Sequence, residues 1–165
     1  MKSINNINQL NKSDFLTIFG NVFEKTAWIA EQVFDLKPFN SNDDLYSKII
    51  HQYESCGKEK ILQILNSHPE LAVEKKLTKD SNNEQKGANL NECTLEEYNE
   101  FKKLNIEYKR KFGFPFIIAV KGKNKNEILK DFKKRIQNDS NIEFIEAKNQ
   151  VKKIASFRFN DILSI

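Results

Sequence analysis

The chain has 165 residues, of which 39% are apolar and 30% charged, and 27 Lys and Arg against 23 Asp and Glu give a formal charge of +4. A chain of this length can bury a sizeable core, so we expect a single domain over residues 1–165, with residues 1–9 as a flexible N-terminus. Its 13 Phe argue against disorder, and its longest apolar run, at residues 114–120, is far shorter than the roughly 18 residues of a membrane span.

The scarcity of cysteine and histidine limits the chemistry that the chain can support. Cys56 and Cys93 form no CxxC pair, and with His51 and His68 they lack the spacing of a conventional zinc site. We therefore expect reduced thiols and metal-free chemistry. Lysines are spread among acidic residues, which favours a solvated surface over a nucleic-acid interface with its concentrated basic face. The sequence thus predicts no nucleic-acid partner and no membrane partner.

Helical spacing of apolar residues dominates the first half of the chain. Apolar positions recur every three or four residues from about 13 to 34. Ser41 precedes a second apolar stripe and is a favoured helix N-cap residue. A third helix around residues 61–65 should end before Pro69, because the residue before a proline avoids helical backbone geometry. His68 is therefore predicted to lie at a helix boundary.

The second half continues the helical pattern around one apolar run. Thr94, with an acidic residue three positions later, predicts a capped helix that ends at Gly113. The run at 114–120 has no partner strand, and a lone strand is unstable, so we expect an extended or helix-like core segment. Further helices are predicted over 128–136 and 144–155. The fold class is all-α, a multi-helix bundle of about six to eight helices with short loops.

Two short polar motifs are candidates for chemistry. His68, in HPELA, has the side chain whose ordinary pKa of about 6.5 suits proton transfer near neutrality, and the alternative is a capping or surface histidine. Ser81 stands three residues before Glu84, the spacing of a second capping box. The functional alternative for SNNEQ is a helix start whose free N–H groups bind an anionic or carbonyl-rich ligand.

Arginine is rare beside lysine. Arg110, Arg135 and Arg158 are the three arginines among 27 basic residues. Because a guanidinium forms planar, two-pronged hydrogen bonds that an ammonium cannot, each marks a position where that geometry is expected to matter. For Glu24, one turn before Trp28, the alternatives are support of a functional site and packing or surface pairing, and the second is favoured. Asn105, on the apolar face of its helix, is expected to make a buried hydrogen bond.

Several segments together resemble the OHCU decarboxylase family. They are FGNVFEKTAWIAE at 19–31, HPELA at 68–72, SNNEQKGA at 81–88, LNIEYKRKFGFPFIIAVKG at 104–122 and QVKKIASFR at 150–158. The resemblance covers the chain from about residue 10 onward. OHCU is 2-oxo-4-hydroxy-4-carboxy-5-ureidoimidazoline, the last unstable intermediate of urate oxidation. The resemblance implies an all-α, cofactor-free decarboxylase, usually a homodimer, that converts OHCU to (S)-allantoin and carbon dioxide.

The resemblance also implies roles for particular residues. It makes His68 the catalytic acid/base, Glu84 its catalytic partner and Arg158 a third catalytic polar group. The residues that it implies in substrate binding are Pro69, Ser81, Asn82, Asn83, Glu84, Gln85, Phe116, Ile117, Ile118, Ala119 and Val120.

The chain departs from the family pattern at a few positions. Thr26 and Ala27 stand where a Ser-Pro pair is usual, Val73 and Asn89 stand where glycine is usual, and the loop from His68 to Ser81 is a few residues short. We expect altered loop geometry from these changes. The sequence reads as a standalone enzyme without a fused hydroxyisourate hydrolase, and its polar N-terminus indicates a cytoplasmic location. The alternative is a catalytically silent helical protein that binds a purine-breakdown metabolite or a protein partner.

Overall fold

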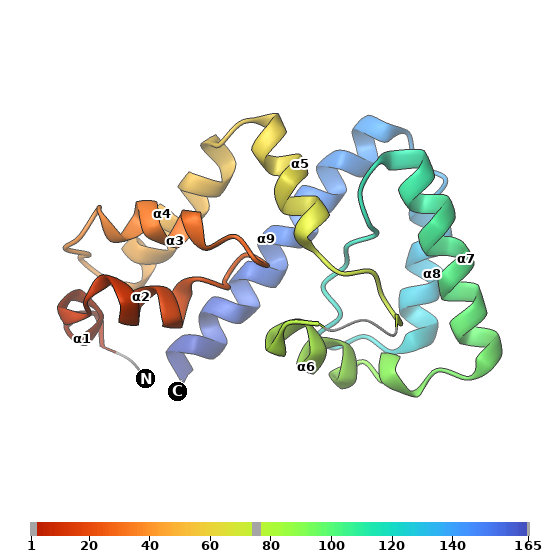
Figure 1. Ribbon diagram of the computed structural model, residues 1–165, viewed down its shortest axis with the longest axis horizontal. Coiled ribbons are helices and arrows are strands. Elements are labelled where there is room, and N and C mark those ends of the chain that lie inside the picture. The colour runs from red at the N-terminus through yellow and green to blue at the C-terminus, as the bar shows by residue number, and fades with distance from the viewer. Residues whose placement is uncertain (1–2, 74–76, 165) are drawn as a thin grey trace. The chain divides into compact units, whose positions relative to one another are not determined.

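The computed structural model describes residues 3–73 and 77–164 (Figure 1). Within these ranges the chain forms nine α-helices, one short 3-10 helix and no strand, so the all-α prediction is confirmed, with more helices than expected. The helices are α1 (Ile4–Gln9), α2 (Lys12–Phe19), α3 (Ala27–Phe34), α4 (Asn42–Ser55), α5 (Lys58–Ser67), α6 (Lys79–Gly87), η1 (Leu90–Glu92), α7 (Leu95–Phe112), α8 (Lys125–Arg135) and α9 (Ser140–Ser164). None of these described helices is long and apolar enough to cross a lipid bilayer.

Packing divides the described chain into two compact units. Unit 1 contains the described residues up to Ser67 and those from Lys152 onward, and unit 2 contains His68–Val151. Helix α9 contributes residues to both units. That the whole chain acts as a single domain stays a prediction.

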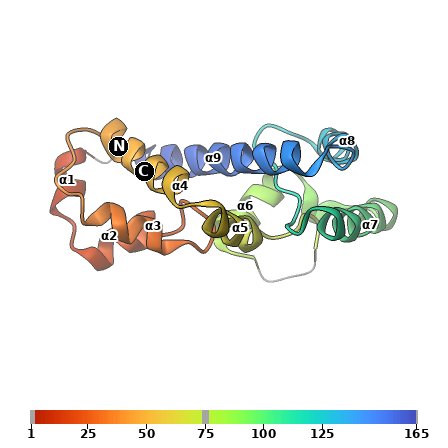
Figure 2. The ribbon, with the colours of Figure 1, turned by 90° about the horizontal axis from the view of Figure 1, so that it is seen from above.

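Unit 1 is organised around aromatic side chains. Helices α2 and α3 lie side by side, as do α3 and α4 (Figures 1 and 2). The ring of Phe23 stacks on that of Tyr53, with centroids 4.7 Å apart, and Phe159 of α9 packs against Phe19. The helical pattern predicted over 13–34 is interrupted between α2 and α3, where the connecting residues carry buried side chains of their own.

The stretch expected to be a flexible N-terminus contains a helix. Residues 4–9 form α1, and the side chain of Ser3 accepts a hydrogen bond from the backbone of Asn6 at its start. Ile7 is buried, and the side-chain amide of Asn8 donates to the carbonyl of Phe39 at 2.8 Å. These contacts fix α1 within unit 1, and the short polar helix gave no clear apolar periodicity in the sequence.

Unit 2 packs α7 against α8 through a cluster of rings. The two helices are neighbours in Figures 1 and 2. The ring of Tyr108 contacts those of Phe116 and Phe132, at centroid distances of 5.3 and 5.7 Å. The predicted capping box of Thr94 is present, and α7 ends at Gly113, whose φ of +80° is a conformation that suits glycine. Residues 114–120 form neither helix nor strand, and all are buried.

The start of α6 corrects one prediction. The N-cap residue is Thr78, whose side chain accepts a hydrogen bond from the backbone N–H of Ser81 at 3.3 Å. Ser81 is therefore inside the helix and does not begin it, and the second capping box at Ser81 and Glu84 was wrong. Thr78 is the N-cap residue because it lies one turn before Ser81, where its side chain can accept hydrogen bonds from the first free N–H groups of the helix.

Candidate active site

His68 occupies the boundary that the sequence predicted. It is the first residue after α5, and its side chain is largely buried at 8% exposure. Its Nε2 atom is buried and forms no hydrogen bond with the described residues, although the residue has other interactions. Pro69, which follows, is half-buried. The imidazole is therefore buried at the end of α5 and does not lie at the surface.

The loop after His68 is held by two side-chain amides. The Oε1 atom of Gln85 accepts from the backbone N–H of Ala72 at 3.1 Å, and its Nε2 atom donates to the carbonyl of Glu70 at 3.2 Å. Asn105 of α7 donates to the carbonyl of Leu71 at 2.9 Å, so its predicted buried hydrogen bond is confirmed. Helices α6 and α7 thus fix the backbone that leads away from His68.

The other predicted residues of α6 differ in exposure. Ser81 is buried like Gln85, Glu84 is half-buried, and Asn82 and Asn83 are exposed. The backbone N–H of Asn82 donates to the carbonyl of Thr78 at 2.9 Å. Since the N–H groups of both Ser81 and Asn82 bond to Thr78, they do not provide the free donors that a helix start at Ser81 would offer.

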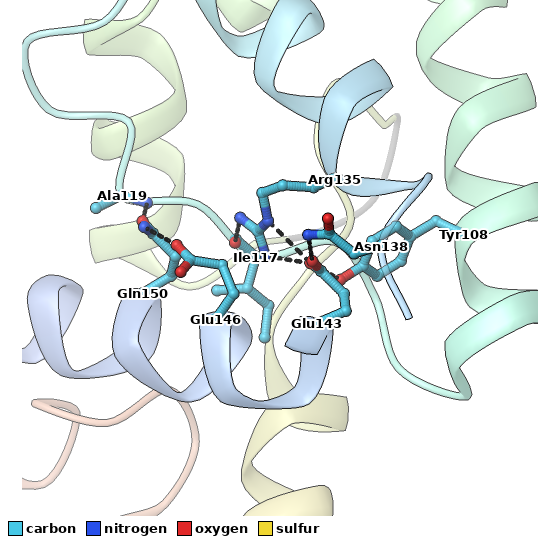
Figure 3. Close-up of polar contacts among 8 residues, drawn as sticks. All are labelled: Tyr108, Ile117, Ala119, Arg135, Asn138, Glu143, Glu146 and Gln150. Atoms are coloured by element: carbon cyan, nitrogen blue, oxygen red, sulfur yellow. Dashed lines mark hydrogen bonds and ion pairs between the residues drawn. The ribbon is translucent and has the colours of Figure 1, made fainter. Parts of the chain in front are cut away.

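The predicted substrate-binding segment at 116–120 is tied to α8 and α9. The carbonyl of Ile117 accepts from Nη1 of Arg135 at 2.7 Å, and the N–H of Ala119 donates to Oε1 of Gln150 at 2.9 Å (Figure 3). The ring of Phe116 stacks on that of Phe132, with centroids 3.9 Å apart. Phe116, Ile117, Ile118, Ala119 and Val120 are all buried, so this segment is an apolar wall with a fixed backbone.

A buried carboxylate lies behind this wall. Glu143 is fully buried, and its Oε1 atom accepts from Nε of Arg135 at 2.9 Å and from the hydroxyl of Tyr108. Its Oε2 atom accepts from Asn138 at 3.0 Å (Figure 3). Burial, and then the hydrogen bond to Glu143, raise the pKa of Tyr108 well above its ordinary value. The sequence marked Arg135, but it gave no sign of Glu143 as its partner.

Arg158 belongs to unit 1, whereas the other predicted site residues belong to unit 2. Its Nη2 atom pairs with Oε2 of Glu24 at 2.8 Å, and its Nη1 atom donates to the carbonyl of Asn21 at 3.0 Å. Both charged side chains are buried. The expectation of packing or surface pairing for Glu24 missed this buried ion pair. Arg110, in contrast, is exposed.

A cavity of about 570 Å³ adjoins two of the predicted residues. Asn82 and Gln85 line it together with Ala72, Leu90 and Tyr98, among others. His68 and residues 116–120 are not among its lining residues. Over the described ranges, no group of three His, Cys, Asp or Glu side chains is arranged to hold a metal ion.

The residues that depart from the family pattern lie in loops or at helix ends. Asn89 adopts a φ of +57°, a left-handed conformation that glycine enters freely and that asparagine tolerates better than most residues. Thr26 precedes α3, and its hydroxyl donates to the carbonyl of Glu24 at 2.8 Å. Residues 74–76 of the loop between His68 and Ser81 lie outside the described residues.

Solved structures share this helical fold. The crystal structure of (S)-allantoin synthase matches 98% of this chain and 54% of its own, with a TM-score of 0.78 and 24% identity. A crystal structure of OHCU decarboxylase in the presence of (S)-allantoin matches 94% of this chain and 100% of its own, with a TM-score of 0.72 and 20% identity. At these identities the likeness establishes the all-α fold.

Sequence comparison then identifies the family. The model of the family described as OHCU decarboxylase matches residues 8–160. The 2-oxo-4-hydroxy-4-carboxy-5-ureidoimidazoline decarboxylase of Haloferax volcanii is 33% identical over 98% of this chain and 96% of its own length, and that of Xenopus laevis is 35% identical over 96% and 93%. The chain therefore belongs to the OHCU decarboxylase family of carbon–carbon lyases.

Some relatives are much longer than this chain. The uric acid degradation bifunctional protein of Bacillus sp. (strain TB-90) is 40% identical over 98% of this chain, which spans only 32% of the length of that relative. The similarity is thus to one part of a two-function protein.

Proposed function

We propose that this protein decarboxylates OHCU to (S)-allantoin and carbon dioxide, without a cofactor, as the last step of urate oxidation. The observation that carries the proposal is the placement of His68, a protected imidazole at a helix end beside a loop that Gln85 and Asn105 hold at successive backbone groups. Family membership over residues 8–160 supplies the substrate class.

The reaction needs an electron sink and a proton, both of which the substrate and one side chain can supply. When the bond to the carboxylate breaks, carbon dioxide leaves and the electron pair passes into the ring toward its C=N bond. The resulting electron-rich, enol-like carbon must then take up a proton. A single positioned proton donor sets the handedness of the product, because it reaches only one face of the ring.

Each predicted residue has a chemical role that fits its type. His68 carries the proton transfer, either by deprotonating the substrate hydroxyl or by protonating the ring carbon. Glu84 holds the imidazole or the ureido N–H groups. Arg158 binds the carboxylate or a ring oxygen through its planar guanidinium. Gln85, which also holds the loop after His68, binds the ureido and ring amides together with backbone groups of residues 116–120 other than the carbonyl of Ile117 and the N–H of Ala119, which Arg135 and Gln150 occupy.

The apolar wall, residues 116–120, is proposed to favour decarboxylation by excluding water from the substrate. Residues 116–120 are buried together with the rings that pack on them. An environment without water disfavours the charged carboxylate relative to uncharged carbon dioxide, and it strengthens the hydrogen bonds that orient the substrate.

The test is to generate OHCU from urate with the two preceding enzymes and to follow the circular dichroism of the allantoin that forms. We expect a dichroic product that appears faster as this protein is added, because spontaneous decay gives a racemic product. Racemic allantoin at the spontaneous rate would overturn the proposal. Tight OHCU binding without acceleration would instead identify the catalytically silent binding protein.

We also propose that the protein is a homodimer in the cytoplasm. Supporting the dimer, unit 2 exposes large apolar side chains along α7, with Leu95 at 74% and Ile106 at 63% exposure. Size-exclusion chromatography with light scattering should give twice the 19.3 kDa chain mass. A monomer at micromolar concentration would contradict the dimer, and recovery in a membrane or organelle fraction would contradict the location.

A further inference from the structure

We propose that Gln150, oriented by Glu146, is a positioning residue that fixes the backbone of the substrate-binding segment through the N–H of Ala119. This inference rests on the proposed function, because it assigns a role in the same reaction. Gln150 and Glu146 are one turn apart on α9. Gln150 begins the segment at 150–158 that carries the family resemblance, but the sequence assigned no role to either residue. Their carboxamide and carboxylate lie in line with Ala119 (Figure 3).

The orientation of the Gln150 amide is set from the side opposite Ala119. The Nε2 atom of Gln150 donates to Oε1 of Glu146 at 2.8 Å. A carboxylate accepts hydrogen bonds and cannot donate them, so the amide must present its N–H₂ group to Glu146. The Oε1 atom of Gln150 is then left to accept from the N–H of Ala119 at 2.9 Å. Glu146 thus keeps the amide in the one orientation that binds the segment.

A second side chain fixes the same segment two residues earlier. Nη1 of Arg135 donates to the carbonyl of Ile117, while the Nε atom of the same guanidinium donates to Glu143. Two anchored points, one donor and one acceptor, define both the position and the tilt of the intervening backbone. Because Ile117, Ile118 and Ala119 are buried, water cannot replace a lost anchor easily.

The two anchors differ in what their loss would do to folding. Arg135 belongs to a buried charged network, so its removal would disturb the core. Gln150 is neutral and half-buried, and it is not one of the two residues whose rings stack, Phe116 and Phe132. Replacing Gln150 therefore separates the position of the segment from the stability of the unit.

The first variant is Gln150→Leu, with Asn149→Leu as the matched control at an exposed position of the same helix. Per folded molecule, we expect Gln150→Leu to lower kcat about tenfold and to change KM less than about threefold, the size of effect that one neutral hydrogen bond supports. Asn149→Leu should keep the wild-type kcat. A purely structural role for Gln150 would lower the thermal midpoint and leave kcat per folded molecule unchanged.

The second variant exchanges the two side chains. In Glu146→Gln with Gln150→Glu, the amide at 146 can donate to the carboxylate at 150, whose other oxygen can accept from the N–H of Ala119. We expect kcat to return to within about threefold of the wild type, since both hydrogen bonds are re-formed. Loss of activity equal to that of Gln150→Leu would overturn the orientation argument.

Hydrogen exchange gives a readout that does not depend on activity. The amide hydrogen of Ala119 should exchange about tenfold or more faster in Gln150→Leu than in the wild type. In the double variant with Glu146→Gln and Gln150→Glu, its protection should return to the wild-type level. Unchanged protection of this amide would overturn the inference. If the wild type itself fails to accelerate formation of dichroic allantoin, the proposed function fails and the inference fails with it. If the wild type is active and Gln150→Leu matches it, only the inference fails.

Discussion

Two of the three arginines form buried ion pairs, and the pairs differ in what they connect. Arg135 and Glu143 are eight residues apart, belong to unit 2, and share their network with Tyr108 and the carbonyl of Ile117. Arg158 and Glu24 join opposite ends of the sequence within unit 1, and Arg158 also bonds to the carbonyl of Asn21. The Arg135–Glu143 pair fixes the segment at 116–120, whereas the Arg158–Glu24 pair fixes Arg158, a residue implied in catalysis.

Two of the three rare arginines in this chain mark buried positions, whether their role is structural or catalytic. In a chain that otherwise uses lysine, Arg135 and Arg158 both mark places where a guanidinium serves several acceptors inside the protein. Burial of the pair is common to both, so burial does not distinguish a structural arginine from a catalytic one. Substitutions that separate stability from activity can make that distinction.

The largest effect, a loss of folding stability, is expected from Glu143→Leu. This change leaves the guanidinium of Arg135 buried without its carboxylate, which should lower the free energy of unfolding by about 3–5 kcal/mol. Urea denaturation followed by circular dichroism measures the loss. The control is Lys133→Ala, which breaks the exposed pair of Lys133 with Glu100 and should cost about 1 kcal/mol or less. Equal effects of the two changes would contradict the importance of the buried pair.

Arg158→Lys should act mainly on the reaction. It keeps the positive charge that Glu24 needs but loses the planar guanidinium, so we expect kcat/KM for OHCU to fall about 100-fold while the protein stays folded. Kinetics of OHCU decay, together with the thermal midpoint, measure both quantities. A loss of less than about threefold would show that Arg158 is a structural arginine like Arg135.

The smallest effect concerns the stability of unit 2 at high pH. The pKa of Tyr108 is raised in the folded protein by burial and by Glu143, so its contribution to stability is complete below about pH 10 and is lost as the pH rises above that value. Between pH 9 and 11, the wild type should lose on the order of 1 kcal/mol more unfolding free energy than Tyr108→Phe. Parallel pH profiles for the two proteins would contradict this ionisation.

The sequence predicted best those features that depend on local chemistry. The capping box of Thr94, the end of α7 at Gly113 and the position of His68 at a helix boundary were all confirmed. Each follows from a few neighbouring residues that satisfy or interrupt helical hydrogen bonds. The start of α6 was misplaced because Thr78 and Ser81 are both good N-cap residues, and the local sequence does not show which of them begins the helix.

Features that depend on distant partners were not predictable. Glu24 and Glu143 look like ordinary surface carboxylates in the sequence, yet each is fully buried against an arginine. Gln85 was implied in ligand binding, and its amide is found to hold the loop after His68. Such pairings arise only when separate segments pack, so no local pattern contains them. The catalytic roles of His68, Glu84 and Arg158 stay predictions.

The most direct test of the proposed mechanism compares the wild type with His68→Asn in the handedness and rate of allantoin formation. If His68 transfers the proton, the wild type forms a dichroic product, and replacement of the imidazole lowers the rate about 100-fold or more and gives a nearly racemic product. The thermal midpoints of the two proteins confirm that both are folded. Dichroic allantoin formed by His68→Asn at the wild-type rate would contradict the assignment of proton transfer to His68.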